Sequence, residues 1–332
     1  MKPSDAPAVS PRSAAALLFL YAQTALHPGS GTALGVVDLP VQRERHTQWP
    51  TIPGSALKGV LRDACREKAK ENYQDEYENQ ALKRTRRQVA NEDDPLLVAA
   101  FGPGKVEESS SHAGAISLTD ARILAFPVRS LKGVFAWVTC RAVLDRLQRD
   151  LTLHNELAAA NRLGLPAAPA EGKALAETGP LLVDGNKLVL EEFEFERADA
   201  TAGVADWVST RAVADAATQE RLKTHLVILS DDEFTHFVRH ATEVVARVGL
   251  DYERKTVRSG ALFYQECLPA ETLFYSVVLA NPSRRAETPR NAADLLKWVR
   301  EHLPPILQIG GDETIGKGLC AVRLWPETED VK

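Results

Sequence analysis

Runs of apolar residues alternate along the chain with long polar stretches, and their spacing predicts both strands and helices. The earliest run, AAALLFLYA at residues 14–22, has no polar position, which is typical of a buried strand. A signal-peptide core is a poor interpretation, because the residues before the run include Asp5 and prolines rather than a basic cluster. Nine apolar residues are also too few to span a bilayer.

Four patterns organise the middle of the chain. Residues 115–140 are rich in β-branched and aromatic side chains and predict two strands. Apolar positions at helical spacing predict a helix over 141–164, which ends near a glycine. A connector rich in proline, alanine and glycine follows at 165–180, and residues 188–196 alternate like a strand with one acidic face.

The clearest helix signal lies in residues 225–250, HLVILSDDEFTHFVRHATEVVARVGL. Ser230 with Glu233 three residues later forms a capping box, the reciprocal pair of hydrogen bonds that begins many helices. Apolar residues then recur at helical spacing, at Phe234, Phe237, Val238, Ala241 and Val245. We expect a strand that leads into a capped helix extending over these positions.

The last third of the chain adds two more strands at 260–280, separated at Pro269, and a helix at 292–303. It closes with ILQIGGDETIGKGLCAVRLW. The order of strands, helices and long insertions predicts an α+β fold of the split βαβ type, with the helices on one face of the sheet.

Residues 65–95 are almost free of large apolar side chains and rich in good helix formers, so they predict a solvated helix that stops at Pro95. The basic run KRTRR at 83–87 can contact a polyanion, but such a run is more often simply solvated.

Composition limits the classes of function. The chain has 332 residues, is 44% hydrophobic and carries a formal net charge of −5, so a nucleic-acid partner needs a local basic surface. Four dispersed cysteines without a C-x-x-C pair argue against a zinc site and a disulfide framework, and favour a reducing cytoplasm. We expect no membrane partner, because the apolar run at 14–22 is too short to span a bilayer.

A glycine-rich segment, GGDETIGKG at 310–318, matches the first seven places of the P-loop pattern. The eighth place fails, because Gly318 stands where Ser or Thr would bind magnesium, and a strand follows. The glycines can still let backbone amides approach a phosphate, and Lys317 adds a charge. The candidate phosphate-binding residues here are Gly310, Gly311, Thr314, Gly316, Lys317 and Gly318; the alternative is a glycine-rich β-turn.

Basic residues concentrate between 41 and 70, a segment that contains seven Lys and Arg residues and only three acidic residues. Pro53-Gly54-Ser55 leads into a helix, so Ser55 is expected to be its N-cap, and helix N-termini attract phosphate. Lys58 and Arg62 are four apart and share one face of that helix. Together with Arg43 they are candidate RNA contacts; the alternative is a solvated amphipathic helix.

These motifs resemble a known family. LHPGSG, DLPVQRE, IPGSALKGVLR and the closing GGDETIGKG are similar to segments of the RAMP proteins of CRISPR systems, and above all to the repeated backbone subunit of the type III-B Cmr effector. The resemblance extends to SDDEFTHFVRHATEVVARV and GALFYQECLPAETLFY. It implies one domain over 1–332, with an RNA-recognition-like (ferredoxin-like) palm, inserted fingers near 65–95 and a thumb hairpin within about 180–225.

The resemblance also implies a function. Copies of the subunit would stack along CRISPR RNA beside other Cmr subunits, and each thumb would interrupt the guide–target duplex at regular intervals. An aspartate after LH-x-GSG is needed in this family to cut target RNA, and the matching position is Asp38. A lone carboxylate can hold Mg²⁺ or another divalent cation when the RNA phosphate supplies further ligands. His27 is a candidate helper, although a histidine beside a turn is more often structural.

Three functions stay open at this point. The first is a CRISPR RNA-binding backbone subunit that is also a target-RNA endonuclease. The second is an RNA-binding scaffold in which Asp38 only shapes its loop, for instance as an Asx-turn. The third is a metal-independent processing ribonuclease that uses His27 for acid–base chemistry.

Overall fold

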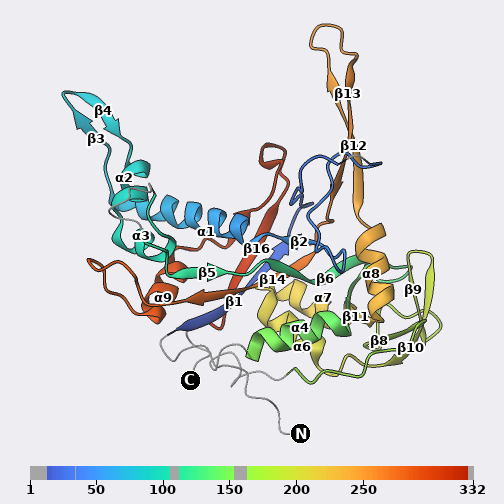
Figure 1. The fold of residues 1–332 in the computed structure, drawn as a ribbon. Coiled ribbons are helices and arrows are strands. Elements are labelled where there is room, and N and C mark those ends of the chain that lie inside the picture. Colours follow the sequence, from blue (N-terminus) through green and yellow to red (C-terminus); the bar gives the residue numbers. More distant parts are fainter. Residues whose placement is uncertain (1–12, 34, 105–111, 153–162, 328–332) are drawn as a thin grey trace.

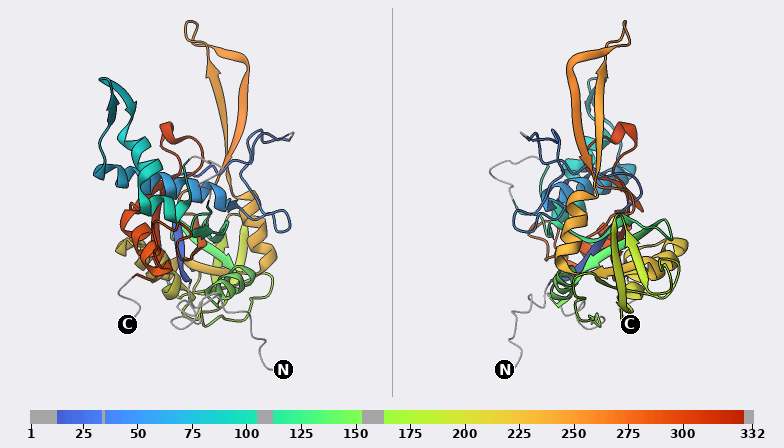
Figure 2. Two further views of the ribbon diagram at one scale, coloured as in Figure 1. Left: turned by 60° about the vertical axis from the view of Figure 1, so that its left-hand side comes forward. Right: turned by 90° about the vertical axis from the view of Figure 1, so that its right-hand side faces the viewer.

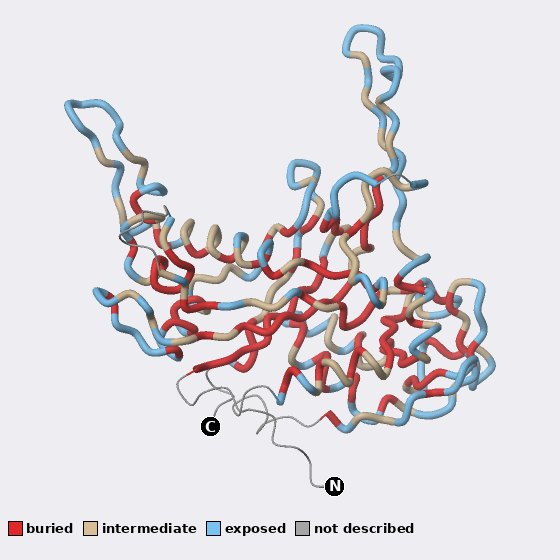
Figure 3. The backbone as a smooth tube through the Cα atoms, in the orientation of Figure 1, coloured by how far each residue is buried: buried red, intermediate tan, exposed pale blue. Residues whose placement is uncertain are grey.

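The computed structural model describes residues 13–33, 35–104, 112–152 and 163–327. Figure 1 shows a body built on one large sheet and two hairpins that project from the same side of that body. The body contains most of the buried residues, whereas both hairpins are largely exposed (Figure 3). None of the helices in the described ranges has both the length and the apolar character that crossing a membrane requires.

The large sheet has twelve strands, ten of which follow the order β15-β16-β1-β14-β6-β7-β11-β8-β10-β9, while β2 pairs with β6 and β5 with β14. Most neighbours are antiparallel, but β7–β11 and β8–β10 are parallel, so the sheet is mixed. Its strands are β1 (Ala14–Ala22), β2 (Thr51–Ile52), β5 (Ile116–Leu118), β6 (Ala121–Arg129), β7 (Phe135–Cys140), β8 (Lys173–Ala176), β9 (Lys187–Leu190), β10 (Phe193–Asp199), β11 (Leu226–Leu229), β14 (Leu273–Ala280), β15 (Ile306–Gln308) and β16 (Leu319–Trp325).

Strand β1 lies inside this sheet, between β14 and β16, and all nine of its residues are buried. The prediction of a buried first strand is confirmed. Because the side chains of a strand alternate between faces, complete burial means that both faces of the sheet are covered here. Phe19 packs edge-on against Trp207 of α6, and α9 also packs on β1. The expectation of helices on one face only is therefore wrong.

The helices group around the sheet: α1, α2, α3 and α9 pack on one another, and α6 packs on α7 (Figure 1). The capping box of Ser230 and Glu233 is confirmed at the start of α8. The helices are α1 (Gly54–Ala69), α2 (Arg86–Asp93), α3 (Pro95–Phe101), α4 (Arg141–Thr152), α6 (Val204–Ala212), α7 (Ala216–His225), α8 (Asp231–His240) and α9 (Ala292–His302), with short 3₁₀ helices η1 (Lys70–Asn72) and η2 (Glu313–Ile315).

The longer projection is an antiparallel hairpin of β12 (Glu243–Leu250) and β13 (Val257–Cys267) (Figures 1 and 2). The predicted helix through Val245 is wrong, because α8 ends at His240. The valines of 243–250 match helical spacing by chance, and β-branched side chains favour a strand. The stretch 180–225, where the family resemblance implies the thumb, contains β9, β10, α6 and α7, and β9 and β10 form an antiparallel hairpin.

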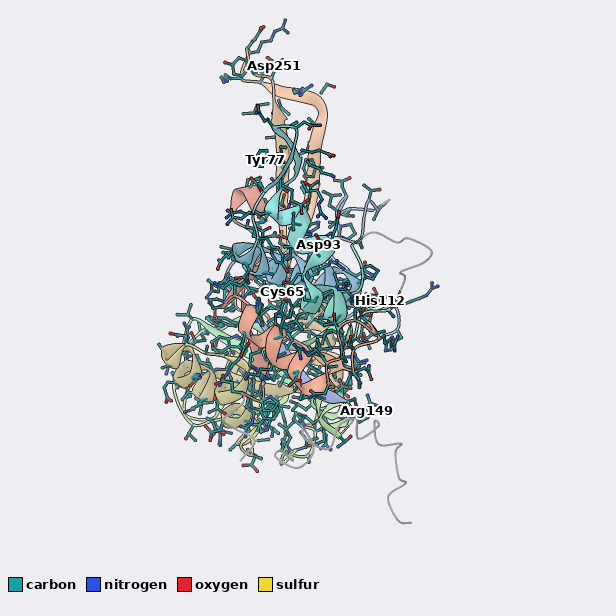
Figure 4. The ribbon with its side chains drawn as sticks, turned by 90° about the vertical axis from the view of Figure 1, so that its left-hand side faces the viewer. Cys65, Tyr77, Asp93, His112, Arg149 and Asp251 are labelled. Carbon is teal, nitrogen blue, oxygen red and sulfur yellow. The ribbon has the colours of Figure 1, made fainter. Side chains whose placement is uncertain are left out.

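The shorter projection is a hairpin of β3 (Glu76–Glu78) and β4 (Ala81–Arg84) within the segment predicted as one helix. Asn79 and Gln80 at its turn both have positive φ, as a tight two-residue hairpin turn requires. Figure 4 labels Tyr77 on this hairpin and Asp251 near the tip of the longer one. The basic run at 83–87 is paired internally, since Arg84 binds Glu76, Glu92 and Asp93, Lys83 binds Glu78, and Arg87 binds Asp63 and Glu67.

Other predicted elements differ in detail. Residues 115–140 form three strands rather than two, the 165–180 connector contains β8, and residues 188–196 turn from β9 into β10. The predicted 141–164 helix is described as far as Thr152, and its next ten residues lie outside the described ranges. The separation of β13 from β14 near Pro269 and the helix at 292–303 are confirmed, the latter to within one residue.

Candidate functional site

Three segments that are far apart in sequence meet at the base of the β12–β13 hairpin. The loop after β1 bridges twice to β13 and its continuation, from Leu26 to Leu268 and from Leu39 to Gln265. The glycine-rich segment 310–318 closes the same region, where Gly311 N donates to His27 O at 3.0 Å. The structure thus connects the Asp38 loop, His27 and the glycine-rich segment at this base, and Figure 2 shows the blue segment after β1 beside the base of the orange hairpin.

Asp38 is partly exposed and is fixed by a strand rather than by its own loop. Its Oδ2 accepts a hydrogen bond of 2.7 Å from the backbone amide of Tyr264 in β13. The adjoining backbone is also paired, because Leu39 N donates to Tyr264 O and Glu266 N donates to Leu39 O. Within the described ranges Oδ1 has no hydrogen-bond partner, so one carboxylate oxygen is free to act on a ligand.

His27 is buried and held by the same strand. Its Nδ1 lies 2.6 Å from Glu266 O and donates to it, so Nε2 is the ring nitrogen that is left for other contacts. A Cβ added at Gly29 would lie 2.8 Å from Nε2, so glycine is needed beside the ring. Tyr264 and Glu266 are two residues apart, roughly 7 Å along a strand, so Asp38 and His27 have neighbouring anchors.

Arg43, a predicted RNA contact, is bound by groups of the protein itself. Its Nη2 donates to Glu266 Oε1 at 2.6 Å, and its Nη1 donates to the carbonyls of Gln48 and Val238. Glu266 is buried and also accepts from Val41 N and Thr242 Oγ1. A buried carboxylate needs such partners, and Arg43 supplies the opposite charge.

The glycine-rich segment is largely closed on itself. The amides of Ile315 and Lys317 donate to Asp312 O, that of Gly316 to Glu313 O and that of Gly318 to Ala25 O. Lys317 Nζ lies 2.9 Å from Cys267 Sγ. Most amides of the predicted phosphate cradle are therefore occupied. Gly310 is required for another reason: its φ is +81°, and a Cβ there would lie 2.4 Å from His27 O. Thr314 is exposed.

At the start of α1 the predicted N-cap is wrong. The helix begins at Gly54 with Pro53 as N-cap, and Asp120, from the distant β5–β6 connection, accepts a 2.7 Å hydrogen bond from Gly54 N. Ser55 is exposed in the first turn. A Cβ at Gly54 would lie 2.7 Å from Leu118 O, so close packing of the helix against that connection decides where it begins.

Lys58 and Arg62 form the cationic face of α1. Burial lowers the pKa of both side chains, and the neighbouring Arg62 charge lowers that of Lys58 further. Arg62 donates to Gly102 O at 2.9 Å, and within the described ranges neither residue forms an ion pair. Half-buried cations without a counter-charge are suited to an anion.

Sequence reasoning missed the polar residues on β13 and their partners. Gln265 and Glu266 interrupt an apolar run as the strand enters the core, which is the only local sign of their role. Asp312 accepts from Gln265 and from Arg247 of β12, so it connects the hairpin to the glycine-rich segment. In the part of the chain that is described, no three His, Cys, Asp or Glu side chains are placed to hold a metal ion.

Comparisons with known proteins agree with this architecture. The RAMP superfamily model matches residues 19–321. The CRISPR system Cmr endoribonuclease Cmr4 of Pyrococcus furiosus is 40% identical over 315 residues, which cover 93% of this chain and 95% of the relative. The CRISPR system CMR subunit Cmr4 of Saccharolobus solfataricus is 27% identical, with 92% and 94% covered.

Solved structures give the same result for the fold. A crystal structure of oligomeric Cmr4 from Pyrococcus furiosus covers 95% of this chain and 100% of its own, with a TM-score of 0.66 at 33% identity. A cryo-EM structure of the type III-B Cmr-beta complex bound to cognate target RNA contains a chain with a TM-score of 0.68 at 23% identity, covering 97% and 100%. The chain therefore belongs to the RAMP superfamily, and the relatives that it resembles within that superfamily are Cmr4 proteins.

Proposed function

We propose that this chain is a backbone subunit of a type III-B CRISPR effector, and that it cuts target RNA with Asp38. The observation that carries the proposal is the free oxygen of a carboxylate whose other oxygen is fixed by Tyr264, at the base of the projecting hairpin. The 40% identity to a protein named as a Cmr endoribonuclease supports the reaction class. An oligomeric relative supports stacking of copies along CRISPR RNA.

The RNA backbone would be held by charge and not by base-specific contacts. Lys58 and Arg62 supply positive charge that no acidic side chain neutralises among the described residues. Guide pairing then supplies the sequence specificity, and the protein reads backbone and shape. The chain carries a net charge of −5, so this local surface has to provide the attraction.

The β12–β13 hairpin is the proposed thumb. One of its faces carries exposed apolar residues from the tip of the hairpin down to its base, and this apolar stripe consists of Val244, Ala246, Val248, Leu250, Val257, Leu262 and Tyr264. An exposed apolar surface of this extent is typical of an interaction site. Inserted across a guide–target duplex, it would unstack one step and bring the adjoining phosphate toward Asp38. The β3–β4 hairpin is the proposed fingers insertion.

In this proposal a ribose 2′-OH attacks the neighbouring phosphate and forms a 2′,3′-cyclic phosphate. The bond between phosphorus and the 5′-oxygen of the next nucleotide breaks, and that oxygen leaves with a proton. The free Asp38 oxygen is placed to orient that hydroxyl or to accept its proton, and His27 Nε2, in its protonated form, is a candidate to donate a proton to the leaving oxygen. Both groups are held by backbone atoms of β13, so their separation is set before RNA binds.

A divalent cation fits this site only as a partner of the substrate. One free carboxylate oxygen, without a cluster of further ligands among the described residues, matches Mg²⁺ that keeps its waters and binds RNA phosphate. When bound it would offset the charge that builds up on the phosphate. Cleavage that is lost in EDTA and restored by Mg²⁺ supports this assignment. Cleavage that persists in EDTA but is lost in His27→Ala would favour metal-independent chemistry.

The hydrogen bond between Asp38 and the Tyr264 amide also supports a second function. Because Asp38 ties its loop to β13, it can serve as a purely structural link in an RNA-binding scaffold. The test uses the subunit assembled with guide RNA and its partner subunits. We expect evenly spaced cuts in complementary RNA, and their loss in Asp38→Ala with RNA binding intact. Unchanged cuts in an assembled Asp38→Ala complex would select the scaffold.

We also assign the assembly to the cytoplasm. The four cysteines, Cys65, Cys140, Cys267 and Cys320, are all buried free thiols, as in proteins of reducing compartments.

A further inference from the structure

The carboxylate of Asp312 joins three segments of the chain. Its Oδ2 accepts hydrogen bonds from Arg247 Nη1 of β12 at 2.8 Å and from Gln265 Nε2 of β13 at 2.7 Å. Arg247 also donates to Gln265 Oε1 at 2.6 Å, so the three side chains form a closed triangle. Asp312 itself belongs to the glycine-rich segment, outside the hairpin.

The surroundings of the Asp312 carboxylate favour its charged form. Burial raises the pKa of Asp312, but the hydrogen bonds from Gln265 and Arg247 and the Arg247 charge outweigh burial, and the pKa lies below its ordinary value. Gln265 is only 3% exposed, so its amide has no access to bulk water as a substitute partner. Asp312 has a φ of +66°, and its carbonyl accepts from the amides of Ile315 and Lys317. The backbone conformation around it is therefore fixed as well.

The triangle lies between the two anchors of the candidate cleavage site. Gln265 is preceded by Tyr264, whose amide holds Asp38, and followed by Glu266, whose carbonyl holds His27. The glycine-rich segment also contacts His27 directly, through Gly311 N. A shift of β13 relative to this segment would consequently change the position of Asp38 relative to His27.

We propose that Asp312 is a positioning residue for RNA cleavage: through Gln265 and Arg247 it holds the base of the β12–β13 hairpin against the glycine-rich segment, and so keeps Asp38 and His27 in register. The proposal rests on the cleavage function proposed above. Asp312 does not contact RNA in this account. Its loss affects the alignment of reacting atoms, for which displacements near 1 Å cost up to about 100-fold in rate, and it leaves the phosphate contacts of α1 in place.

The test measures single-turnover cleavage and target-RNA affinity separately, in the complex assembled with guide RNA. In Asp312→Ala we expect cleavage to slow by roughly 10- to 100-fold, with target affinity at the wild-type value. Asp312→Asn keeps an acceptor oxygen but loses the charge, so its rate should lie between the two. Glu313→Ala is the matched control, because Glu313 is the exposed neighbouring acid without a side-chain partner among the described residues, and it should cleave normally.

A double-mutant cycle separates this role from a general loss of stability. Arg247→Ala and Asp312→Ala act on one interaction, so the double variant should cleave no more slowly than the slower single variant. Wild-type cleavage in Asp312→Ala, or an equal loss of affinity and rate, would overturn the proposal. If the complex with Asp312→Ala does not assemble, cleavage at the wild-type rate in both Asp312→Asn and Arg247→Ala would overturn the proposal. Asp38→Ala is run in parallel: if it still cuts, the cleavage function itself fails and this inference fails with it.

Discussion

The Asp38 carboxylate accepts a hydrogen bond from the backbone amide of Tyr264, a residue 226 positions further along the chain. The bond joins the loop after β1 to the base of the β12–β13 hairpin. Because the donor is a backbone group, the position of Asp38 depends on where β13 lies and not on the identity of the Tyr264 side chain. A nucleic acid that engages the hairpin base therefore meets a carboxylate whose orientation is already set.

Lys58 is the most direct test of the cationic face of α1. Lys58→Ala should weaken RNA binding and reduce the slope of log affinity against log salt by about 0.7 to 0.9, the contribution of one phosphate contact. The measurement is RNA affinity over a salt series. Lys132→Ala, which removes an exposed lysine from the β6–β7 turn, is the control and should leave the slope unchanged. An unchanged slope in Lys58→Ala would remove this residue from the RNA surface.

Glu266 should be essential for stability. Its side chain is 9% exposed and pairs with Arg43 at 2.6 Å, so Glu266→Ala leaves a mostly buried guanidinium without its counter-charge. We expect the free energy of unfolding to fall by about 3–5 kcal/mol in urea denaturation. Glu243→Ala, an exposed acid on the neighbouring strand, should change it by less than about 0.5 kcal/mol. Equal effects of the two variants would contradict the structural role of the Arg43–Glu266 pair.

The apolar stripe of the hairpin should matter for function and not for folding. Val248 and Leu262 face each other across the strands and are 49% and 52% exposed. The double variant Val248→Ser/Leu262→Ser should keep the unfolding free energy within about 0.5 kcal/mol, because it removes little buried surface. The regular spacing of cuts in target RNA should be lost. Leu131→Ser, at a turn position 69% exposed, is the control; regular cuts in the double variant would refute the thumb assignment.

Glu271 should make stability depend on pH. Burial raises its pKa above the ordinary 4.5, and Tyr21 Oη donates a hydrogen bond to it. A group whose pKa is higher in the folded state contributes stability in full below its unfolded pKa, and that contribution is lost as pH rises through the folded pKa. Glu271→Gln stays neutral, so near neutral pH its Tm should exceed that of the wild type, and the two should converge below pH 4.5. Parallel Tm curves over the whole range would be inconsistent with this assignment.

The sequence correctly predicted those elements that are determined by residues close together in the chain. The unbroken apolar run of β1 and the Ser230–Glu233 capping box each contain their own explanation, and both are confirmed. Ser55 failed as an N-cap because the helix begins with Pro53 as its N-cap, two residues earlier, where Asp120, 66 positions away from Gly54, accepts the hydrogen bond of the Gly54 amide. The β3–β4 hairpin was missed because Arg84 is held by acids from both the hairpin and α2, which helix propensity does not record.

In the candidate site, too, the sequence indicated some residues but not the distant residues that hold them in place. Asp38 and His27 could be selected from the sequence because a family resemblance marked their segment. The partners that fix them could not, since Tyr264 and Glu266 act through backbone atoms that carry no side-chain signature. The glycine-rich segment was expected to use its amides for phosphate, but Ala25, His27 and its own carbonyls accept most of them.

The proposed function requires that the negative charge of Asp38 takes part in RNA cleavage, beyond the structural link that its carboxylate makes to β13. Asp38→Asn tests this most directly, because the amide oxygen can still accept from Tyr264 N while the negative charge is lost. The measurement is the single-turnover rate of target-RNA cleavage in the complex assembled with guide RNA. We expect a complex that assembles and binds target RNA normally but makes no cuts. Cleavage by Asp38→Asn at the wild-type rate would contradict the proposed function.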